Sequence, residues 1–528
     1  MKSIREYHEA TKHSWEKLYR NRHSIDWSNE PNPFRTYPDC PRIDPGSNFE
    51  KMEGVLSHVW PFPNSRPGNT PVTLNTLSTL LYYSMAVSAW KSYPGGRPWS
   101  LRVNPSSGDL HPTETHLYVH TVNGLPSGAY HYYVKDHQVE QRATGDFVPY
   151  IWQSLGGTSD IPPVIIGLNS IFWREAWKYQ SRALRYCYLD LGHAMACIMV
   201  AAHALGLYTL FIGEFYDDNI RRYLCLDKTD EYPLLFLAID TQQPGVNGYQ
   251  KKIQKGTIDA SMHINKLSNE ETDYPLIRHG HELTCKKCYK RTSQQNPGSG
   301  VNMSFPEDDK ESMKIDSYIS DIAENSLKWT IRKRRSALDF DGRTLLPFNV
   351  FSFLTQLLCF PYKADFFIPE DLPLVIPYLY IHRVEDLEKG VYYLHRTDKR
   401  LFPVAKGDMR YIAKELSLNQ DIAGDSAFAV SFISNFDYAL EKYGERGYRY
   451  IHYEAGLMGQ ALYLGATATG FDATGIGAFI DDDVHTFLKT PSEQQVVYHF
   501  TVGKRIDDPR LTTLPAYKHI HDDEEDRR

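Results

Sequence analysis

Residues 178–218 read KYQSRALRYCYLDLGHAMACIMVAAHALGLYTLFIGEFYDD, and residues 442–482 repeat this stretch at a constant offset of 264 positions without a gap. The two stretches share 14 identities in 41 positions, and matched helical periodicity does not explain them, because glycines and charged residues coincide. The identical residues of the first stretch are Lys178, Tyr179, Arg182, Arg185, Tyr186, Gly192, Ala202, Ala204, Gly206, Ile212, Gly213, Phe215, Asp217 and Asp218. We therefore interpret the chain as an internal duplication.

The similarity between the two copies extends beyond this stretch. GAYHYY at 128–133 resembles GVYYLH at 390–395 at an offset of 262, and PLLFLAID at 233–240 aligns with VYHFTVGK at 497–504 at 264. Each copy thus contains strands, one long helix, a glycine turn, a second helix and a further strand. We expect an α+β protein whose two copies pack as an intramolecular pseudo-dimer, because duplicated domains typically descend from homodimers.

Apolar spacing sets the main helices. It predicts a helix over 71–92 and a long helix over 179–205. The uncharged stretch 195–213 has the length of a membrane span, but Gly206 interrupts it and favours a buried helix, a glycine cap and a strand. We therefore expect no membrane-spanning segment.

Shifts in composition divide the chain into five parts. We expect an N-terminal extension that wraps the core at 1–65, a first domain at 66–241 and a second domain at 326–510. Residues 242–325 are poor in apolar side chains and predict a linker or loosely packed excursion. Residues 511–528 predict an acidic tail.

Composition and charge narrow the class of protein. The 528 residues (60.8 kDa) are 41% hydrophobic and 23% charged, which is typical of globular proteins and excludes a fibrous chain. The net charge of −7 offers no basic surface to nucleic acid. The charged N-terminus lacks a signal-peptide core, and seven cysteines fit a reducing compartment. We therefore expect a cytoplasmic protein without a nucleic-acid partner.

One CxxC motif lies in the middle segment, at Cys285 and Cys288, with His279 and His281 upstream. Zinc sites usually combine two clustered pairs of ligands, and the spacing here is unusual for such a site. A redox pair is the other alternative. We expect incidental linker cysteines and no metal site.

Three kinds of loop have a composition that suits a ligand. RVNPSSGDLHP at 102–112 has small residues that let a planar molecule approach the backbone, although ordinary turns share this composition. RKRRSALDF at 332–340 offers guanidinium groups to a phosphate, or else forms a solvated basic face. FIGEF at 211–215 and GIGAF at 475–479 place a glycine where backbone N–H groups either face a ligand or end a loop.

Taken together, these residues resemble the FMN-dependent nitroreductase superfamily, in its SagB-type (azoline dehydrogenase-like) branch. The motifs that carry the resemblance in the first half are REYHEATKHS at 5–14, RVNPSSGDLHPTE at 102–114, GAYHY at 128–132, KYQSRALRYCYLDLGH at 178–193 and HALGL at 203–207. The second half matches more loosely, through RRS at 334–336, KYGERGYRYIHYEAG at 442–456 and GIGAF at 475–479.

The resemblance implies FMN bound at the interface of a dimeric α+β fold. In the family one half supplies the phosphate-binding Arg-x-Ser segment and the glycine loop beside flavin N5, and the other half supplies the Pro-Ser-Ser loop. Carried onto this chain, the cofactor-binding positions are Arg334, Arg335 and Ser336 at the phosphate, Gly477 and Ala478 near N5, Pro105, Ser106, Ser107 and Gly108 in the opposite loop, Arg102 at the isoalloxazine or ribityl edge, and Lys504 and Arg505 at the phosphate or pyrimidine.

The chain departs from the family pattern at three places. Leu338 replaces the basic residue that follows Arg-x-Ser, so phosphate binding would rely on Arg335, Arg343 or Lys504. The first copy reads NSRPGNTP at 64–71 instead of Arg-Arg-Ser, and the second reads IPEDLPLVIP at 368–377 instead of Pro-Ser-Ser-Gly. Only one of the two pseudo-symmetric sites has both parts, so we expect one FMN per monomer.

The resemblance implies an FMN-dependent oxidoreductase of the SagB type, which transfers hydride through flavin N5. Azoline-type peptides or small molecules are the expected substrates. Lys178 and Tyr179 match the family's Lys-Tyr pair and are the predicted catalytic residues, unless they only cap their helix in solvent. The alternatives are an NAD(P)H-dependent nitro or quinone reductase and a flavin-binding scaffold subunit of a peptide-modifying complex.

Overall fold

The chain folds into two halves of the same design. The computed structural model describes residues 1–20, 24–60, 70–246, 258–287, 312–315, 322, 325–360, 362–367 and 372–520. The sheet of the first half is antiparallel and contains, in spatial order, β1 (Arg42–Ile43), β6 (Gln138–Thr144), β5 (Gly128–Tyr133), β4 (Thr113–Val119), β7 (Val164–Ser170), β9 (Tyr232–Asp240) and β8 (Tyr208–Ile212). The sheet of the second half repeats this order with β10 (Met313–Lys314), β13 (Arg400–Lys406), β12 (Gly390–His395), β11 (Val375–Ile381), β14 (Phe428–Ser434), β16 (Gln495–Gly503) and β15 (Asp472–Ile476).

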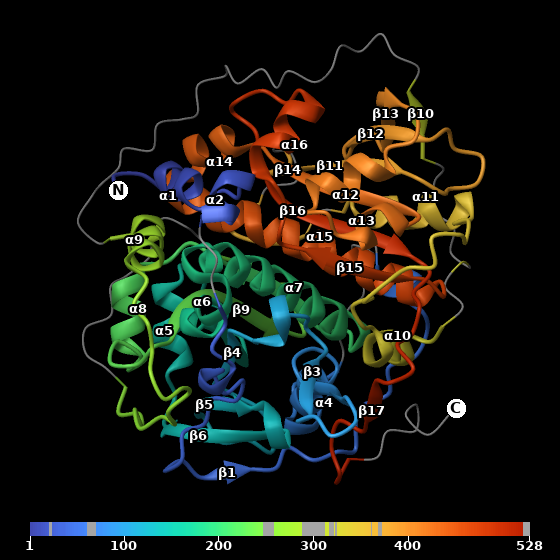
Figure 1. Cartoon of the computed structure of the whole chain (residues 1–528). Helices are drawn as coiled ribbons and strands as arrows, with labels where there is room; N and C mark the ends of the chain where they lie inside the picture. The colour runs from blue at the N-terminus through green and yellow to red at the C-terminus, as the bar shows by residue number, and fades with distance from the viewer. Residues whose placement is uncertain are drawn as a thin grey trace.

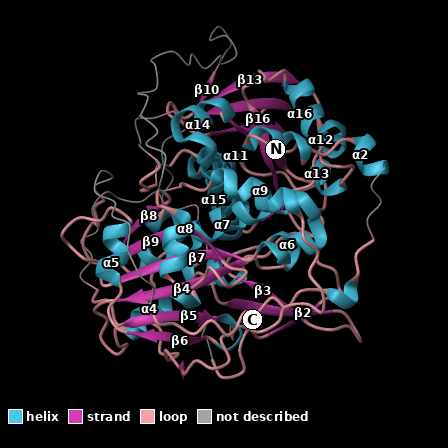
Figure 2. Ribbon diagram, turned by 90° about the vertical axis from the view of Figure 1, so that its left-hand side faces the viewer, coloured by secondary structure: helices cyan, strands magenta, loops and turns pink. Residues whose placement is uncertain are grey.

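Two long helices separate the two sheets. Figures 1 and 2 show α7 (Ala183–Ala204) and α15 (Gly447–Ala468) side by side at the centre, with one sheet on each side. The remaining helices outside the functional regions described below are α2 (Trp15–Arg20), α3 (Leu56–Val59), α5 (Val148–Ser154), α11 (Phe348–Leu357), α12 (Arg410–Leu416) and α13 (Asp421–Asp425).

The expected duplication and α+β fold are confirmed. α6 (Phe172–Tyr179) precedes α7, and α14 (Phe436–Tyr443) precedes α15, so each helix pair matches at the offset of 264 at both ends. One detail of the alignment is wrong. Ile212 pairs with Phe236 while Ile476 pairs with His499, so β9 and β16 correspond at an offset of 263 instead of 264.

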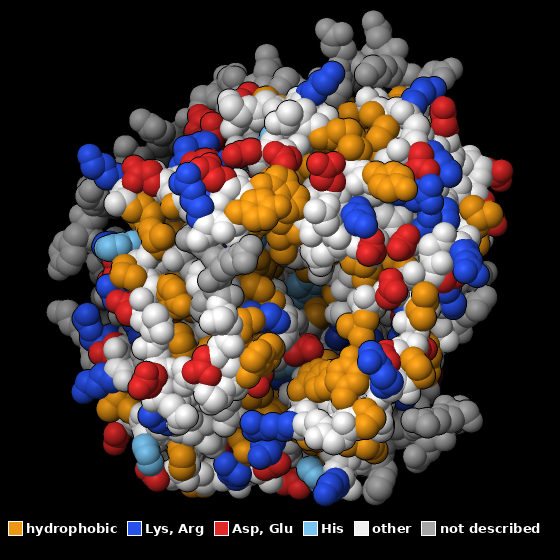
Figure 3. Space-filling view, in the orientation of Figure 1, with side chains coloured by type: hydrophobic (Ala, Val, Ile, Leu, Met, Phe, Trp, Pro, Cys, Tyr) orange, Lys and Arg blue, Asp and Glu red, His pale blue; other side chains and the backbone are white. Residues whose placement is uncertain are grey.

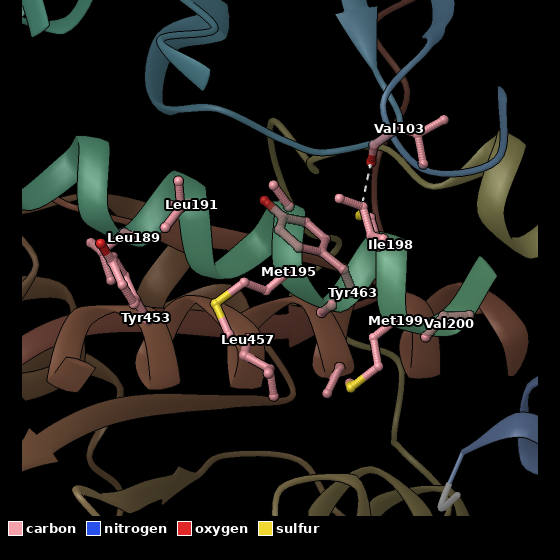
Figure 4. Close-up of a cluster of buried hydrophobic side chains, with 14 of the residues drawn as sticks. Val103, Leu189, Leu191, Met195, Ile198, Met199, Val200, Tyr453, Leu457 and Tyr463 are labelled. Carbon is pink, nitrogen blue, oxygen red and sulfur yellow. Dashed lines mark hydrogen bonds between the residues drawn. The ribbon is translucent and has the colours of Figure 1, made fainter. Parts of the chain in front are cut away.

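The matched glycines of the repeat lie where α7 crosses α15. A Cβ atom on Gly192 would lie 2.2 Å from the carbonyl oxygen of Tyr453, and one on Gly456 would lie 2.1 Å from that of Leu189. Around this crossing the contact is apolar, and Figure 4 shows Met195 of α7 and Leu457 of α15 in the buried cluster. The two glycines therefore allow the backbones to approach closely.

The matched charges of the repeat join the halves reciprocally. Asp481, which begins α16 (Asp481–Leu488), is bound by Arg182 at 3.0 Å and Arg185 at 2.7 Å. Asp217, which begins α8 (Asp217–Tyr223), is bound in the same way by Arg446 at 2.5 Å and Arg449 at 2.8 Å. All these side chains are buried, so each half supplies two arginines to the aspartate of the other.

Burial on all sides explains the apolar sequence of α7. The stretch Phe172–Ala204 has the length and composition of a membrane span, but 89% of its most apolar window is buried inside the protein. The uncharged stretch 195–213 forms the end of α7 and then β8, as expected. The helix predicted over 71–92 is wrong in its second part, because α4 (Leu74–Tyr82) ends early and β2 (Val87–Ser92) follows.

The N-terminal extension contacts both halves. α1 (Ile4–Ala10) lies on the second half, where Ile4 N donates to Glu445 Oε2 at 2.5 Å and His8 Nε2 lies 3.2 Å from Gln495 Oε1. Farther along, Tyr37 N donates to Glu140 Oε2 of the first sheet at 2.9 Å. These contacts fit an extension that wraps the core.

The described part of the middle segment contains a helix that its composition does not predict. α9 (Pro275–Thr284) packs at the interface, where Ile277 is buried and Arg446 Nη1 donates to Thr284 O at 3.1 Å. Cys285 lies next to this helix, whereas Cys288 lies outside the described residues. No cluster of three metal-ligating side chains occurs in the described part of the chain.

The C-terminal segment returns to the first half instead of forming an acidic tail from residue 511. β17 (Thr512–Leu514) pairs with β2, which pairs with β3 (Trp99–Arg102) in a three-stranded sheet. Tyr517 is buried, and its hydroxyl donates to Val134 O at 2.8 Å. Residues 521–528 lie outside the described part.

Candidate functional site

A cavity of about 900 Å³ lies between the two halves. Figure 3 shows a hollow near the centre of this face, bordered by charged and apolar side chains. The predicted site residues that line the cavity are Arg102, Pro105, Ser106, Ser107, Gly108, Tyr179, Arg334, Arg335, Ser336, Gly477, Ala478, Lys504 and Arg505. Lys178 lies beside this lining, and Arg343 is not part of it. The fold therefore brings together loops that are more than two hundred residues apart in sequence.

The Pro-Ser-Ser-Gly loop follows β3 and ends in a short 3₁₀ turn, Ser107–Asp109. Gly108 has a φ of +65°, and a Cβ atom there would lie 2.7 Å from Lys178 Nζ. Ser106 Oγ accepts from His111 N at 2.8 Å, which closes the turn. Small side chains and a left-handed glycine thus bring backbone to the cavity wall.

The Arg-Arg-Ser segment follows α10 (Leu327–Lys333) on the opposite wall. The Arg334 guanidinium is buried, donates to Arg102 O at 3.0 Å, and has no hydrogen-bond partner at Nε among the described residues. Burial lowers the pKa of Arg334. Arg335 donates to the backbone oxygens of Arg332 and Ser88. Arg334 is therefore the buried cation of this segment with a free donor.

The glycine loop after β15 forms a third wall. A Cβ atom on Gly477 would lie 2.0 Å from the Tyr186 ring, whose hydroxyl donates to Gly477 O at 3.0 Å. In the part of the chain that is described, the N–H groups of Gly477 and Ala478 have no acceptor. These two backbone donors are available to a ligand in the cavity.

Lys178 and Tyr179 end α6 and lie next to the Pro-Ser-Ser-Gly loop. Both side chains are half-buried, and Lys178 Nζ lies 5.5 Å from the centre of the Tyr179 ring. Burial and the nearby Glu175 carboxyl raise the pKa of Tyr179 well above its ordinary value, so the phenol keeps its proton at neutral pH. The pair combines the flexible amino group of a lysine with a phenol donor at the cavity wall.

The other basic side chains predicted to bind the cofactor also bind groups of the protein itself. The Arg102 guanidinium donates to Thr113 O at 3.3 Å and to Pro33 O at 2.5 Å. Burial lowers the pKa of Arg102 to about 10. Lys504 Nζ donates to Gly470 O at 2.8 Å, and Arg505 pairs with Asp472 at 3.0 Å. Arg102 thus ties the loop to the N-terminal extension, and the other two lie at the second-half wall.

Sequence reasoning missed two carboxyl groups behind the Pro-Ser-Ser-Gly loop. Asp190 lines the cavity from α7, and Glu175 of α6 hydrogen-bonds Ser106. The alignment of Asp190 with Glu454 in the repeat was the available signal. Glu175 has no such signal, because its counterpart is Ala439. Contacts between helices bring the pair together.

The chain itself fills the equivalent position on the other side of the interface, which is also built from both halves and is called the closed half of the interface below. Gly213 corresponds to Gly477, and Gly213 N donates to Asp365 Oδ1 at 2.7 Å. Glu214 N donates to Asp365 Oδ2 at 3.2 Å. The N–H groups of Gly213 and Glu214, which correspond to those of Gly477 and Ala478, are therefore bound by the Asp365 carboxylate.

An aromatic ring completes this closure. Tyr450, the counterpart of Tyr186, stacks on Phe366 with ring centroids 4.2 Å apart and planes 7° from parallel. A Cβ atom on Gly213 would lie 2.6 Å from the Phe366 ring. Residues 64–69 of the first motif replacement and 368–371 of the second lie outside the described residues.

Comparisons with known proteins agree with this duplicated architecture. A model of the nitroreductase family matches residues 68–239 and 378–504, one stretch in each half and together more than half of the chain. A crystal structure from Anabaena variabilis, provisionally described as a nitroreductase, is 25% identical with a TM-score of 0.76, and the match covers 96% of this chain and 100% of that one. A protein of Methanocaldococcus jannaschii with the same provisional description is 27% identical over 175 residues, which are 32% of this chain and 82% of that protein.

Proposed function

The chain belongs to the nitroreductase family, and on that premise we propose that it is an FMN-dependent oxidoreductase with one flavin site in the cavity between its halves. The observation that carries this proposal is the contrast between Gly477 and Gly213. The N–H of Gly477 has no acceptor among the described residues, whereas the N–H of Gly213 is bound by Asp365. The second half thus offers a backbone donor to a flavin ring, whereas the equivalent donor of the first half is already bound.

The residues around the cavity fit FMN by their chemistry. A dianionic phosphate suits the buried Arg334 guanidinium, whose Nε has no partner among the described residues, with Ser336 and Lys504 on the same half. The backbone donors of Gly477 and Ala478 suit the N5 edge of the ring, and the small residues of the loop at 105–108 suit its opposite edge. We assign these residues to cofactor binding.

When bound, FMN accepts or donates hydride at N5. Lys178 Nζ is our candidate to take a proton from substrate carbon, because it lies beside the loop that would line the ring. The Tyr179 hydroxyl, which holds its proton at neutral pH, would orient the substrate by donating a hydrogen bond. This arrangement would serve a SagB-type dehydrogenation of an azoline-type peptide or small molecule.

The central experiment is anaerobic reduction of the purified, FMN-loaded protein. Bleaching of the flavin absorbance by an azoline-containing peptide, without bleaching by NADH or NADPH, would support the dehydrogenase. Rapid bleaching by NADH or NADPH would support the alternative nitro or quinone reductase. Bound FMN that is bleached by neither kind of reductant would support the flavin-binding scaffold subunit, and a folded protein that binds no FMN would contradict all three.

A further inference from the structure

Two buried carboxyl side chains lie behind the Pro-Ser-Ser-Gly loop. Glu175 and Asp190 are 0% and 3% exposed. Within the described part of the chain, neither forms an ion pair with a lysine, arginine or histidine. Buried carboxylates without a cationic partner are costly, so at least one of the two is held neutral by a proton.

The hydrogen bonds show which carboxyl carries that proton. Asp190 accepts from Ser107 N, at 3.2 Å to Oδ1 and 3.3 Å to Oδ2, and from Ser107 Oγ at 3.3 Å. Glu175 Oε1 accepts from Ser106 Oγ at 3.2 Å, whereas the buried Oε2 receives no donor from the described residues. Neighbouring serines thus hold the two carboxyls at the same turn. Asp190 is the better supplied with donors, which assigns the proton to Glu175.

The second half stabilises the equivalent carboxylate in a different way. Glu454, the counterpart of Asp190, pairs with the buried Arg396 and accepts from Leu374 N at 3.1 Å. The counterpart of Glu175 is Ala439, so the second half has no second carboxyl at that position. A proton on Glu175 thus takes the place that an arginine occupies in the closed half.

We propose that Glu175 and Asp190 form a positioning pair that shares one proton and thereby holds Ser106 and Ser107 in the conformation that lines the cavity. The inference rests on the proposed function, because the loop that the pair holds is the one assigned to FMN. Removing the shared proton would place two carboxylates side by side, so they would separate and pull the two serines out of position.

The surroundings set the direction of the pH dependence. Burial and the charge of the partner raise the pKa of Glu175 well above its ordinary value, and burial raises that of Asp190. The titratable groups that face the pair are Lys178 and Tyr179 from α6, Cys187 from α7 and Tyr498 from β16. Of these, Lys178 opposes the shift in Glu175. The pair therefore loses its proton on the alkaline side.

FMN titrations of the apoprotein across pH test this role. We expect the affinity of the wild type to fall by up to about tenfold per pH unit once the free protein loses the shared proton. Glu175→Gln keeps a donor to Asp190 and an acceptor for Ser106 at every pH, so its FMN affinity should stay high and flat. Glu175→Ala should bind weakly throughout. Glu214→Gln, in the closed half, is the matched control and should follow the wild type.

Infrared spectroscopy of the apoprotein provides a test that does not need FMN. The wild type should show the C=O stretching band of a buried protonated carboxyl at neutral pH, and Glu175→Gln should lack it. An unchanged band in Glu175→Gln, or an FMN affinity that falls with pH in that variant as in the wild type, would overturn the pair. A wild type that shows the band and binds no FMN would instead defeat the proposed function and retain the proton-sharing pair.

Discussion

Gly192 of α7 and Gly456 of α15 face each other across the helix crossing, and a Cβ atom on Gly192 would lie 2.9 Å from the Cα of Gly456. The two residues occupy equivalent positions of the repeat, so the approach of the two halves depends on the same glycine used twice. The cavity lies along this interface, which means that its width depends on the distance between the two helices.

Gly192→Ala should therefore destabilise the protein by roughly 1–3 kcal/mol, because the added methyl would overlap the backbone of α15. Urea unfolding measures the loss. Gly245→Ala is the matched control, since its Cβ would meet Thr158 at an ordinary 3.4 Å, and it should change stability by less than about 0.5 kcal/mol. Equal stability of the two variants would show that the helices do not need this approach.

Acid should weaken the interface through Asp481. Burial alone would raise the pKa of Asp481, but Arg182 and Arg185 outweigh it and hold the pKa at about 2. Because this value is below the ordinary 3.8, the carboxylate contributes stability above pH 4 that is lost as the pH falls toward 2. The contribution is about 2 kcal/mol.

Asp481→Asn should consequently be less stable than the wild type at neutral pH, with the difference shrinking between pH 4 and pH 2 in thermal melts. Asp482→Asn is the control, since the exposed Asp482 pairs with Lys12 at the surface and should matter little. A stability difference for Asp481→Asn that stays constant over this range would contradict the assignment.

Lys178→Ala should retain FMN but slow substrate oxidation by about 10²-fold, the usual contribution of a general base. Lys442→Ala removes the equivalent lysine from the closed half and should leave turnover unchanged. Stopped-flow reduction of the loaded protein separates the two variants. Normal turnover in Lys178→Ala would exclude the lysine as the base.

Opening the closed half should cost stability without creating a site. Asp365→Ala leaves the N–H groups of Gly213 and Glu214 without their acceptor, so we expect a loss of about 1–3 kcal/mol. Asp365→Asn keeps an acceptor oxygen and should lose less. Denaturation gives the stability, and flavin absorbance counts the cofactor. A second bound FMN in Asp365→Ala would contradict our account of this half.

The sequence contains enough to predict the duplicated architecture, because the same residues join both halves. Gly192 meets its own counterpart, and Arg182 and Arg185 bind the matched aspartate of the other copy. The repeat therefore predicts the interface, and the resemblance brings the loops at 105–108 and 334–336 to one cavity.

Other features depend on contacts that no local pattern contains. The helix predicted over 71–92 stops at Tyr82, because its second part forms β2, which pairs with β3 and with β17 from the far end of the chain. The role of Glu175 depends on its neighbour Asp190, and the role of Phe366 depends on its stacking with Tyr450. Each of these depends on two segments that meet through the fold.

The ratio of bound FMN to protein chain, measured by flavin absorbance on the monomer fraction from gel filtration, tests the central claim most directly. The free donors of Gly477 and Ala478 lie in one half, and Asp365 and Phe366 fill the equivalent position of the other. The account predicts a ratio of about one on a monomer, because Asp365 and Phe366 occupy the position that a second flavin would need. A ratio near two, or FMN bound only by a dimer of chains, would contradict it.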